Sequence, residues 1–138
     1  MWKTYAILSA LFAALTAIFA KIGIKEVNSN LATAIRTGVI LLITWGIVLA
    51  NGHIKDVRTL SNNTWLFLIL SGVATGLSWL FYFKAIQLGP VSRVAPIDKL
   101  SVVITILLSV IFLKEELSLR VLVGGALIAA GSIVMIIK

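Results

Sequence analysis

The sequence contains no cysteine, one histidine and only five acidic residues among its 138 positions. The missing cysteines exclude disulfides and thiolate metal sites, and no cluster of histidine and carboxylate side chains forms a metal-ligand pattern instead. The sequence also lacks a glycine-rich phosphate loop and a nucleophile paired with a base. These absences predict that the chain is not an enzyme and carries neither a metal nor a cofactor.

Charged residues are scarce, at 12% of the chain, whereas 60% of the residues are hydrophobic. A soluble domain is about 45–50% apolar and 25% charged. The composition therefore predicts an all-α integral membrane protein. The net charge of +7 comes from basic residues scattered around apolar segments rather than gathered on one face, so nucleic-acid binding is not expected.

Five apolar segments are long enough to cross a lipid bilayer, which takes about 20 residues. Together they form one domain over residues 1–138, with approximate spans at 4–24, 31–50, 65–88, 94–113 and 121–137. The first segment lacks a convincing cleavage site and is interpreted as a retained span, not a signal peptide. The polar loop after the second span suits a short surface helix and holds His53, interpreted as solvated. Pro90 and Pro96 predict a broken or kinked start of the fourth span.

The fourth span carries two charges that it cannot easily keep out of the membrane. The uncharged run from Leu100 to Leu113 covers roughly 21 Å at ~1.5 Å per residue, less than the ~30 Å hydrocarbon core. A helix long enough to cross the hydrocarbon core must begin near Val94, which places Asp98 and Lys99 below the membrane interface. Charged residues there usually face a bundle interior or water. The two residues either neutralise each other or, because adjacent helical positions point about 100° apart, pair with groups on other helices.

Polar side chains of the third and fourth spans each line one helix face. The two stripes consist of Ser71, Thr75, Ser78 and Tyr82 in the third span and of Asp98, Ser101, Thr105 and Ser109 in the fourth. Each hydroxyl taken alone is explained by a bond to its own helix backbone or to a neighbouring helix. The two stripes together, beside the charged pair, favour a polar pathway.

The residues predicted to bind a substrate lie along this pathway. Trp79 either stacks on the substrate or is an interfacial aromatic, and its depth of more than one turn favours stacking. Arg36 either binds an anion or extends to the lipid headgroups. Arg36 and Lys99 outnumber Asp98, so the pathway would be net positive and favour a carboxylate or phosphate. The full predicted set is Asp98, Lys99, Trp79, Tyr82, Ser78, Ser101, Arg36 and Thr75.

Basic residues outside the membrane divide evenly between its two sides. With five spans, one side carries Lys3, Lys55, Arg58, Lys114 and Arg120, and the other carries Lys21, Lys25, Lys84, Arg93 and Lys138. This balance gives no orientation bias. Either one orientation is set by other factors, such as the first helix, or both orientations insert and pair as an antiparallel homodimer.

With these residues placed, the chain resembles the EamA-type domain of the drug/metabolite transporter superfamily over essentially its whole length. The resemblance rests on KIGIKEVNSNLATAIRT after the first span, GLSWLFYFKAIQLGPVSRVAPIDKLS across the third and fourth, and LKEELSLRVLVGGALIAAGSIVMI at the end. In the last segment, Glu115 matches the glutamate of the family's Leu-x-Glu turn. Most members carry two such units in inverted orientation, whereas this chain has one, which implies that a second copy supplies the other half.

Members of that family move amino acids, metabolites, drugs, sugar phosphates or nucleotide sugars, usually through a cavity lined by the first four helices of each half. The resemblance implies one half of an inverted-repeat transporter in the cell membrane, the inner membrane if the cell is Gram-negative. We expect an antiparallel homodimer that exports or exchanges small polar metabolites, anionic or zwitterionic, by alternating access. The alternative is a non-transporting membrane subunit, such as a lipid-carrier accessory protein with a different partner.

Overall fold

The computed structural model describes residues 1–137, and all of the regular structure in this part of the chain is helical. This confirms the predicted all-α fold. Lys138, counted above among the basic residues, lies outside the described residues. The elements are α1 (Trp2–Gly23), α2 (Ser29–Ala50), the 3₁₀ helix η1 (His53–Thr59), α3 (Asn62–Leu88), α4 (Val91–Asp98), α5 (Leu100–Leu113) and α6 (Leu119–Ile136).

Five helical segments in residues 1–137 are long and apolar enough to cross a membrane: α1, α2, α3, α6 and the combined α4–α5 segment. Their large apolar side chains are mostly exposed, as at Leu42 and Phe112, which are both 75% exposed. Exposed apolar surface costs about 25 cal/mol per Å² in water, but it is the stable outer surface in lipid. The five segments confirm the predicted multi-pass membrane protein.

Capping side chains determine where several helices begin. The side chain of Asn28 accepts hydrogen bonds from two backbone N–H groups at the start of α2. The Ser61 hydroxyl accepts one from the Thr64 N–H at 3.2 Å, and the Ser118 side chain accepts one from the Val121 N–H at 3.3 Å. Each cap satisfies an N–H that the helix cannot, worth about 1 kcal/mol. The last two caps explain why α3 and α6 begin before residues 65 and 121.

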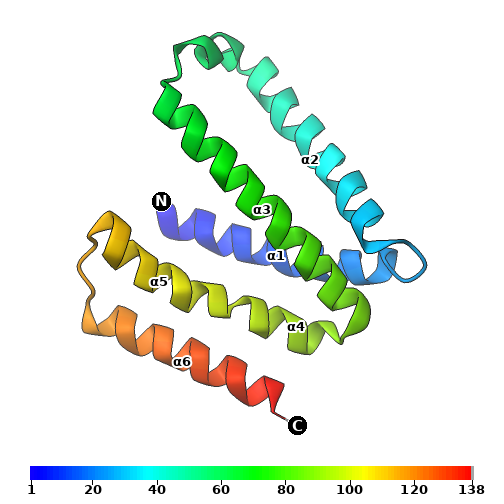
Figure 1. Ribbon diagram of the computed structural model, residues 1–138, viewed down its shortest axis with the longest axis vertical. Helices are drawn as coiled ribbons and strands as arrows, with labels where there is room; N and C mark the ends of the chain where they lie inside the picture. Colours follow the sequence, from blue (N-terminus) through cyan, green and yellow to red (C-terminus); the bar gives the residue numbers. More distant parts are fainter. Residues whose placement is uncertain (138) are drawn as a thin grey trace. The chain divides into compact units, whose positions relative to one another are not determined.

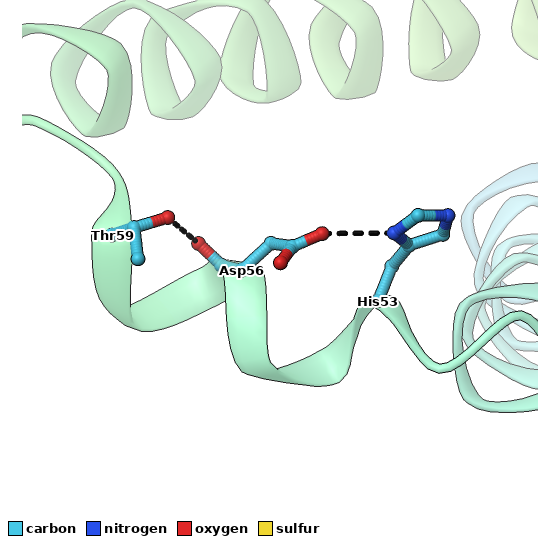
Figure 2. A network of polar contacts seen from close by, with 3 residues as sticks. All are labelled: His53, Asp56 and Thr59. Atoms are coloured by element: carbon cyan, nitrogen blue, oxygen red, sulfur yellow. Dashed lines mark hydrogen bonds and ion pairs between the residues drawn. The ribbon is translucent and has the colours of Figure 1, made fainter.

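The loop between α2 and α3 folds as η1, a short polar helix. The His53 Nδ1 atom lies 2.8 Å from Asp56 Oδ2, and the Thr59 hydroxyl donates to the Asp56 backbone carbonyl at 2.8 Å (Figure 2). The side chains of His53 and Asp56 are 67% and 68% exposed, so water screens the pair and it adds little stability. His53 is therefore exposed, as its loop position predicted, but it has a carboxylate partner.

The helices group into two compact units. One comprises Met1–Ile18 together with the chain from Leu88 onward, and the other comprises Phe19–Gln87. In the first unit, α6 lies beside both α4 and α5 (Figure 1). In the second unit, η1 packs on α2, and long polar side chains connect α3 to the turn before α2 and to α2 itself.

Gly125 lies at the contact between α6 and α5. It is buried, and a Cβ atom at this position would come within 3.1 Å of Ile106 Cδ1. At the neighbouring Gly124, a Cβ atom would have nothing within 4 Å. Small residues let transmembrane helices approach closely, and in this chain that role falls to the second glycine of the pair.

Replacing Gly125 with leucine should lower the melting temperature of the purified protein, because overpacking a close contact typically costs about 1–3 kcal/mol. Gly124→Leu is the matched control, since it adds the same side chain one residue away into open space. Thermal unfolding of both variants in the same lipid nanodiscs measures the difference. Equal melting temperatures would show that α6 does not depend on this contact.

Candidate functional site

The fourth span is interrupted inside the membrane-crossing segment, as its prolines predict. Pro90 precedes α4, and Pro96 lies within it and has no N–H to donate to the preceding turn. Lys99 lies between α4 and α5, where its N–H approaches the carbonyls of Ala95 at 3.3 Å and Pro96 at 3.1 Å. Asp98 and Lys99 therefore lie at the junction of α4 and α5, a one-residue break at which the Lys99 backbone stays in the αR region.

Asp98 and Lys99 contact each other across this break. The Lys99 Nζ atom lies 3.5 Å from Asp98 Oδ2, a loose ion pair, and the two side chains are 57% and 36% exposed. The two side chains thus contact each other, as the first of the two alternatives expects, and no ion pair with another helix occurs among residues 1–137. The pair lies roughly 12 Å along the span from Val91 at ~1.5 Å per residue. Charges at such a depth in a membrane span are costly unless they are paired or hydrated.

Two hydroxyls of the predicted stripes bond to the backbone of their own helices. The Thr75 hydroxyl donates to the Ser71 carbonyl at 2.8 Å, and the Ser109 hydroxyl donates to the Ile106 carbonyl at 2.9 Å. Such bonds to the backbone of the same helix explain these two hydroxyls without a polar pathway. Ser78 and Ser101 are exposed on α3 and α5. The stripes thus remain a prediction, and the charged and aromatic residues give the site its distinctive geometry.

Arg36 extends from α2 to the aromatic face of α3. Its guanidinium carbon lies 4.1 Å from the centre of the Trp79 ring and 4.9 Å from the centre of the Phe83 ring. The two rings share a helix face because they are four residues apart. A cation over an aromatic face gains about 2 kcal/mol or more when it is desolvated. The rings therefore stabilise the charge of Arg36 in a setting that otherwise disfavours it.

One end of the Arg36 guanidinium is left without a partner. Its NH1 atom is buried and has no hydrogen-bond partner among residues 1–137. Phe83 beside it is only 3% exposed, and Tyr82 packs its ring edge-on against Phe83 at 6.3 Å between ring centres. A buried donor without an acceptor costs about 1–3 kcal/mol. The cluster thus holds a positive charge with unused hydrogen-bonding capacity.

Two further polar side chains connect the end of α3 to the turn between α1 and α2. The Gln87 amide nitrogen donates to the carbonyls of Val27 at 2.9 Å and Ile24 at 3.3 Å. The Lys21 ammonium donates to the Ile86 carbonyl. These bonds satisfy carbonyls that no helix ladder reaches. They also set the position of α3 relative to the start of α2, and hence of the rings relative to Arg36.

Sequence reasoning missed Phe83, Gln87 and Lys21. A usable signal was present for two of them, since Phe83 and Gln87 follow Trp79 at spacings of four and therefore share its helix face. Spacing along one helix does not tell which other helix that face meets. The partner on α2 is visible only in the structure.

The predicted site residues fall into two groups, one in each unit. Arg36 of α2 and four residues of α3 (Thr75, Ser78, Trp79 and Tyr82) belong to the second unit, where Arg36 meets Trp79 directly. Asp98, Lys99 and Ser101 belong to the first, where they follow one another across the α4–α5 break. In the part of the chain that the structure describes, no group of three histidine or acidic residues is arranged to hold a metal ion.

The sequence model of the EamA-like transporter family matches residues 1–137. The chain belongs to this family. A Sinorhizobium protein, named an uncharacterized transporter in the cobO 3′ region, is 52% identical over 97% of this chain and 95% of its own length. The uncharacterized transporter YojE of Bacillus subtilis is 29% identical over 72% of this chain but only 35% of its own length.

A third relative, the uncharacterized protein MJ1333.1 of Methanocaldococcus jannaschii, is 32% identical over 73% of this chain and 70% of its own length. No solved structure matches the chain. The family match confirms the resemblance inferred from the sequence, and it covers all five membrane-crossing segments. The chain is thus a multi-pass membrane protein of a transporter family.

Proposed function

We propose that two copies of this chain, inserted in opposite orientations, form an alternating-access transporter of small polar metabolites in the cell membrane. The observation that carries this proposal is a family match that extends over all five membrane-crossing segments. Inverted-repeat transporters place their substrate site between two such units. A second copy of the same chain supplies the other unit.

The relatives support this arrangement by their lengths. The Sinorhizobium transporter aligns over 95% of its own length, so a chain of nearly this size carries the name transporter. The matched part of the Bacillus transporter is 35% of that protein, which leaves room for a second unit of similar size. The even division of basic residues between the two sides of the membrane favours insertion in both orientations.

The substrate centre of the first unit is proposed to be Asp98 and Lys99, with Ser101 beside them. Their ion pair is loose, at 3.5 Å, and lies at a helix break, so each charge can exchange its partner for a charged group of a solute. Broken helices serve this purpose in inverted-repeat transporters because their free backbone ends and charges face the binding site. Such a pair accommodates a zwitterion or, with a further cation, an anion.

Counterflow into proteoliposomes tests the transporter proposal. Vesicles containing the purified protein are loaded with unlabelled amino acids, dicarboxylates or sugar phosphates, and entry of the same labelled compound is followed. We expect saturable uptake of at least one class, above that of protein-free vesicles. No uptake of any class, combined with purification of the chain in complex with a different membrane protein, would favour the accessory-subunit alternative.

A further inference from the structure

We infer that Arg36, which lies over the rings of Trp79 and Phe83, binds the oxyanion of a small soluble molecule through its planar guanidinium. The oxyanion is a carboxylate or a phosphate. The three residues are called the arginine cluster below. This inference deepens the proposed transport function and rests on it, because it names the class of solute that the protein recognises.

The charge around Arg36 is the first argument. Among the described residues, no aspartate or glutamate lies within ion-pair distance of Arg36; the ion pairs are His53–Asp56 and Asp98–Lys99. Arg36 lies seven residues into α2, roughly 10 Å along the helix at ~1.5 Å per residue. A charge at that depth is costly without compensation. An anion is the ligand that compensates it most fully.

The geometry of the guanidinium is the second argument. The central carbon of the guanidinium lies over the Trp79 and Phe83 rings, at 4.1 and 4.9 Å from the ring centres. These contacts use the faces of the rings and occupy none of the N–H donors with an acceptor. A guanidinium carries its N–H donors in its own plane, and the buried NH1 atom has no acceptor among the described residues. Two parallel N–H donors match the two oxygens of a carboxylate or phosphate.

The third argument is that the side chain is held in place. An arginine that only extends to the headgroups would be directed away from the protein, whereas Arg36 lies against α3 beside the buried Phe83. Gln87 and Lys21 hold the end of α3 through three backbone carbonyls. A side chain already ordered in the free protein loses less entropy when a ligand binds. The arginine cluster is thus preorganised.

Thermal unfolding in nanodiscs tests the inference without requiring transport. The probes are inorganic phosphate and acetate, compared with chloride at equal ionic strength, because a ligand that binds the folded state raises the melting temperature. We expect both probes to stabilise the wild-type protein and the Arg58→Gln control, whose arginine is exposed on η1. Arg36→Gln should show no such shift. An equal shift in Arg36→Gln, or none in the wild type, would overturn the inference.

Conservative variants separate ligand binding from a structural role. Arg36→Lys keeps the positive charge but loses the planar fork, so it should unfold like the wild type without ligand and bind phosphate about tenfold more weakly. Phe83→Leu should also weaken phosphate binding, whereas Phe81→Leu, at a position 74% exposed, should not. Wild-type phosphate affinity in Arg36→Lys would contradict recognition by the guanidinium.

The lipid composition distinguishes a soluble anion from a lipid headgroup. Nanodiscs made of galactolipids contain no phosphate, and soluble phosphate should stabilise the protein in them as it does in phosphatidylcholine. Arg36-dependent stabilisation that appears only with phospholipid would instead identify a headgroup contact and overturn the inference.

Transport measurements separate the arginine site from the transporter proposal. If Arg36→Gln still transports with unchanged substrate preference, the arginine site is refuted while the transporter proposal remains intact. Arg36-dependent binding of phosphate without transport of any solute would support the arginine site and count against the transporter proposal.

Discussion

Adding lysines to one side of the membrane should abolish transport by that variant alone, and co-expression with an oppositely biased variant should restore it. One variant carries Asn51→Lys and Asn63→Lys on the η1 side, and the other carries Asn30→Lys and Ser92→Lys on the opposite side. All four positions are exposed. Lysine and arginine bias sets the orientation of short-loop membrane proteins, so an excess of two lysines on one side should decide insertion when the wild-type count is balanced.

The readouts are transport and the location of a C-terminal reporter. Wild-type chains should show reporter signal on both sides of the membrane, and each lysine variant should show it on one side only. Recovery of transport on co-expression of the two variants shows that each variant alone lacks an oppositely oriented partner. A misfolded variant would not recover transport in this way. A single uniform orientation of the wild-type chain would contradict the antiparallel homodimer.

The second large effect is expected at Asp98 and Lys99. Lys99→Ala should weaken binding of an anionic or zwitterionic substrate by about ten- to a hundredfold, since a hydrogen bond to a charged group is worth about 1.5–3 kcal/mol. Asp98→Asn should change the coupling of transport to the proton gradient, because Asp98 is the one acidic residue in the five described membrane-crossing segments. Transport in reconstituted vesicles at several pH values measures both effects.

Two exposed residues provide matched controls for this experiment. Lys55→Ala removes a lysine on η1, and Glu116→Gln neutralises an acid in the connector between α5 and α6. Neither should alter substrate affinity or coupling. If the Asp98 and Lys99 variants insert normally and transport at the wild-type rate across pH, the pair only anchors the fourth span at the interface.

Much of this protein was predictable from local sequence. Apolar length and composition predicted five membrane-crossing helices, because the bilayer permits few alternatives to a helix of about 20 apolar residues. Pro90 and Pro96 predicted the interruption of the fourth span, since a proline inside a helix removes a hydrogen bond wherever it lies. Asn28 caps α2 through hydrogen bonds to the next few residues, so this cap depends on local sequence alone.

Only the tertiary structure decided which faces meet. The sequence left two roles for Arg36, binding an anion or extending to the lipid headgroups. The structure places its guanidinium against the Trp79 and Phe83 rings. Gly124 and Gly125 are equivalent by composition, yet only Gly125 meets Ile106. The reason is physical: helical periodicity defines a face relative to its own axis, and in lipid an apolar face gains little by choosing protein over acyl chains. The rotation of each helix therefore depends on contacts between residues far apart in the sequence.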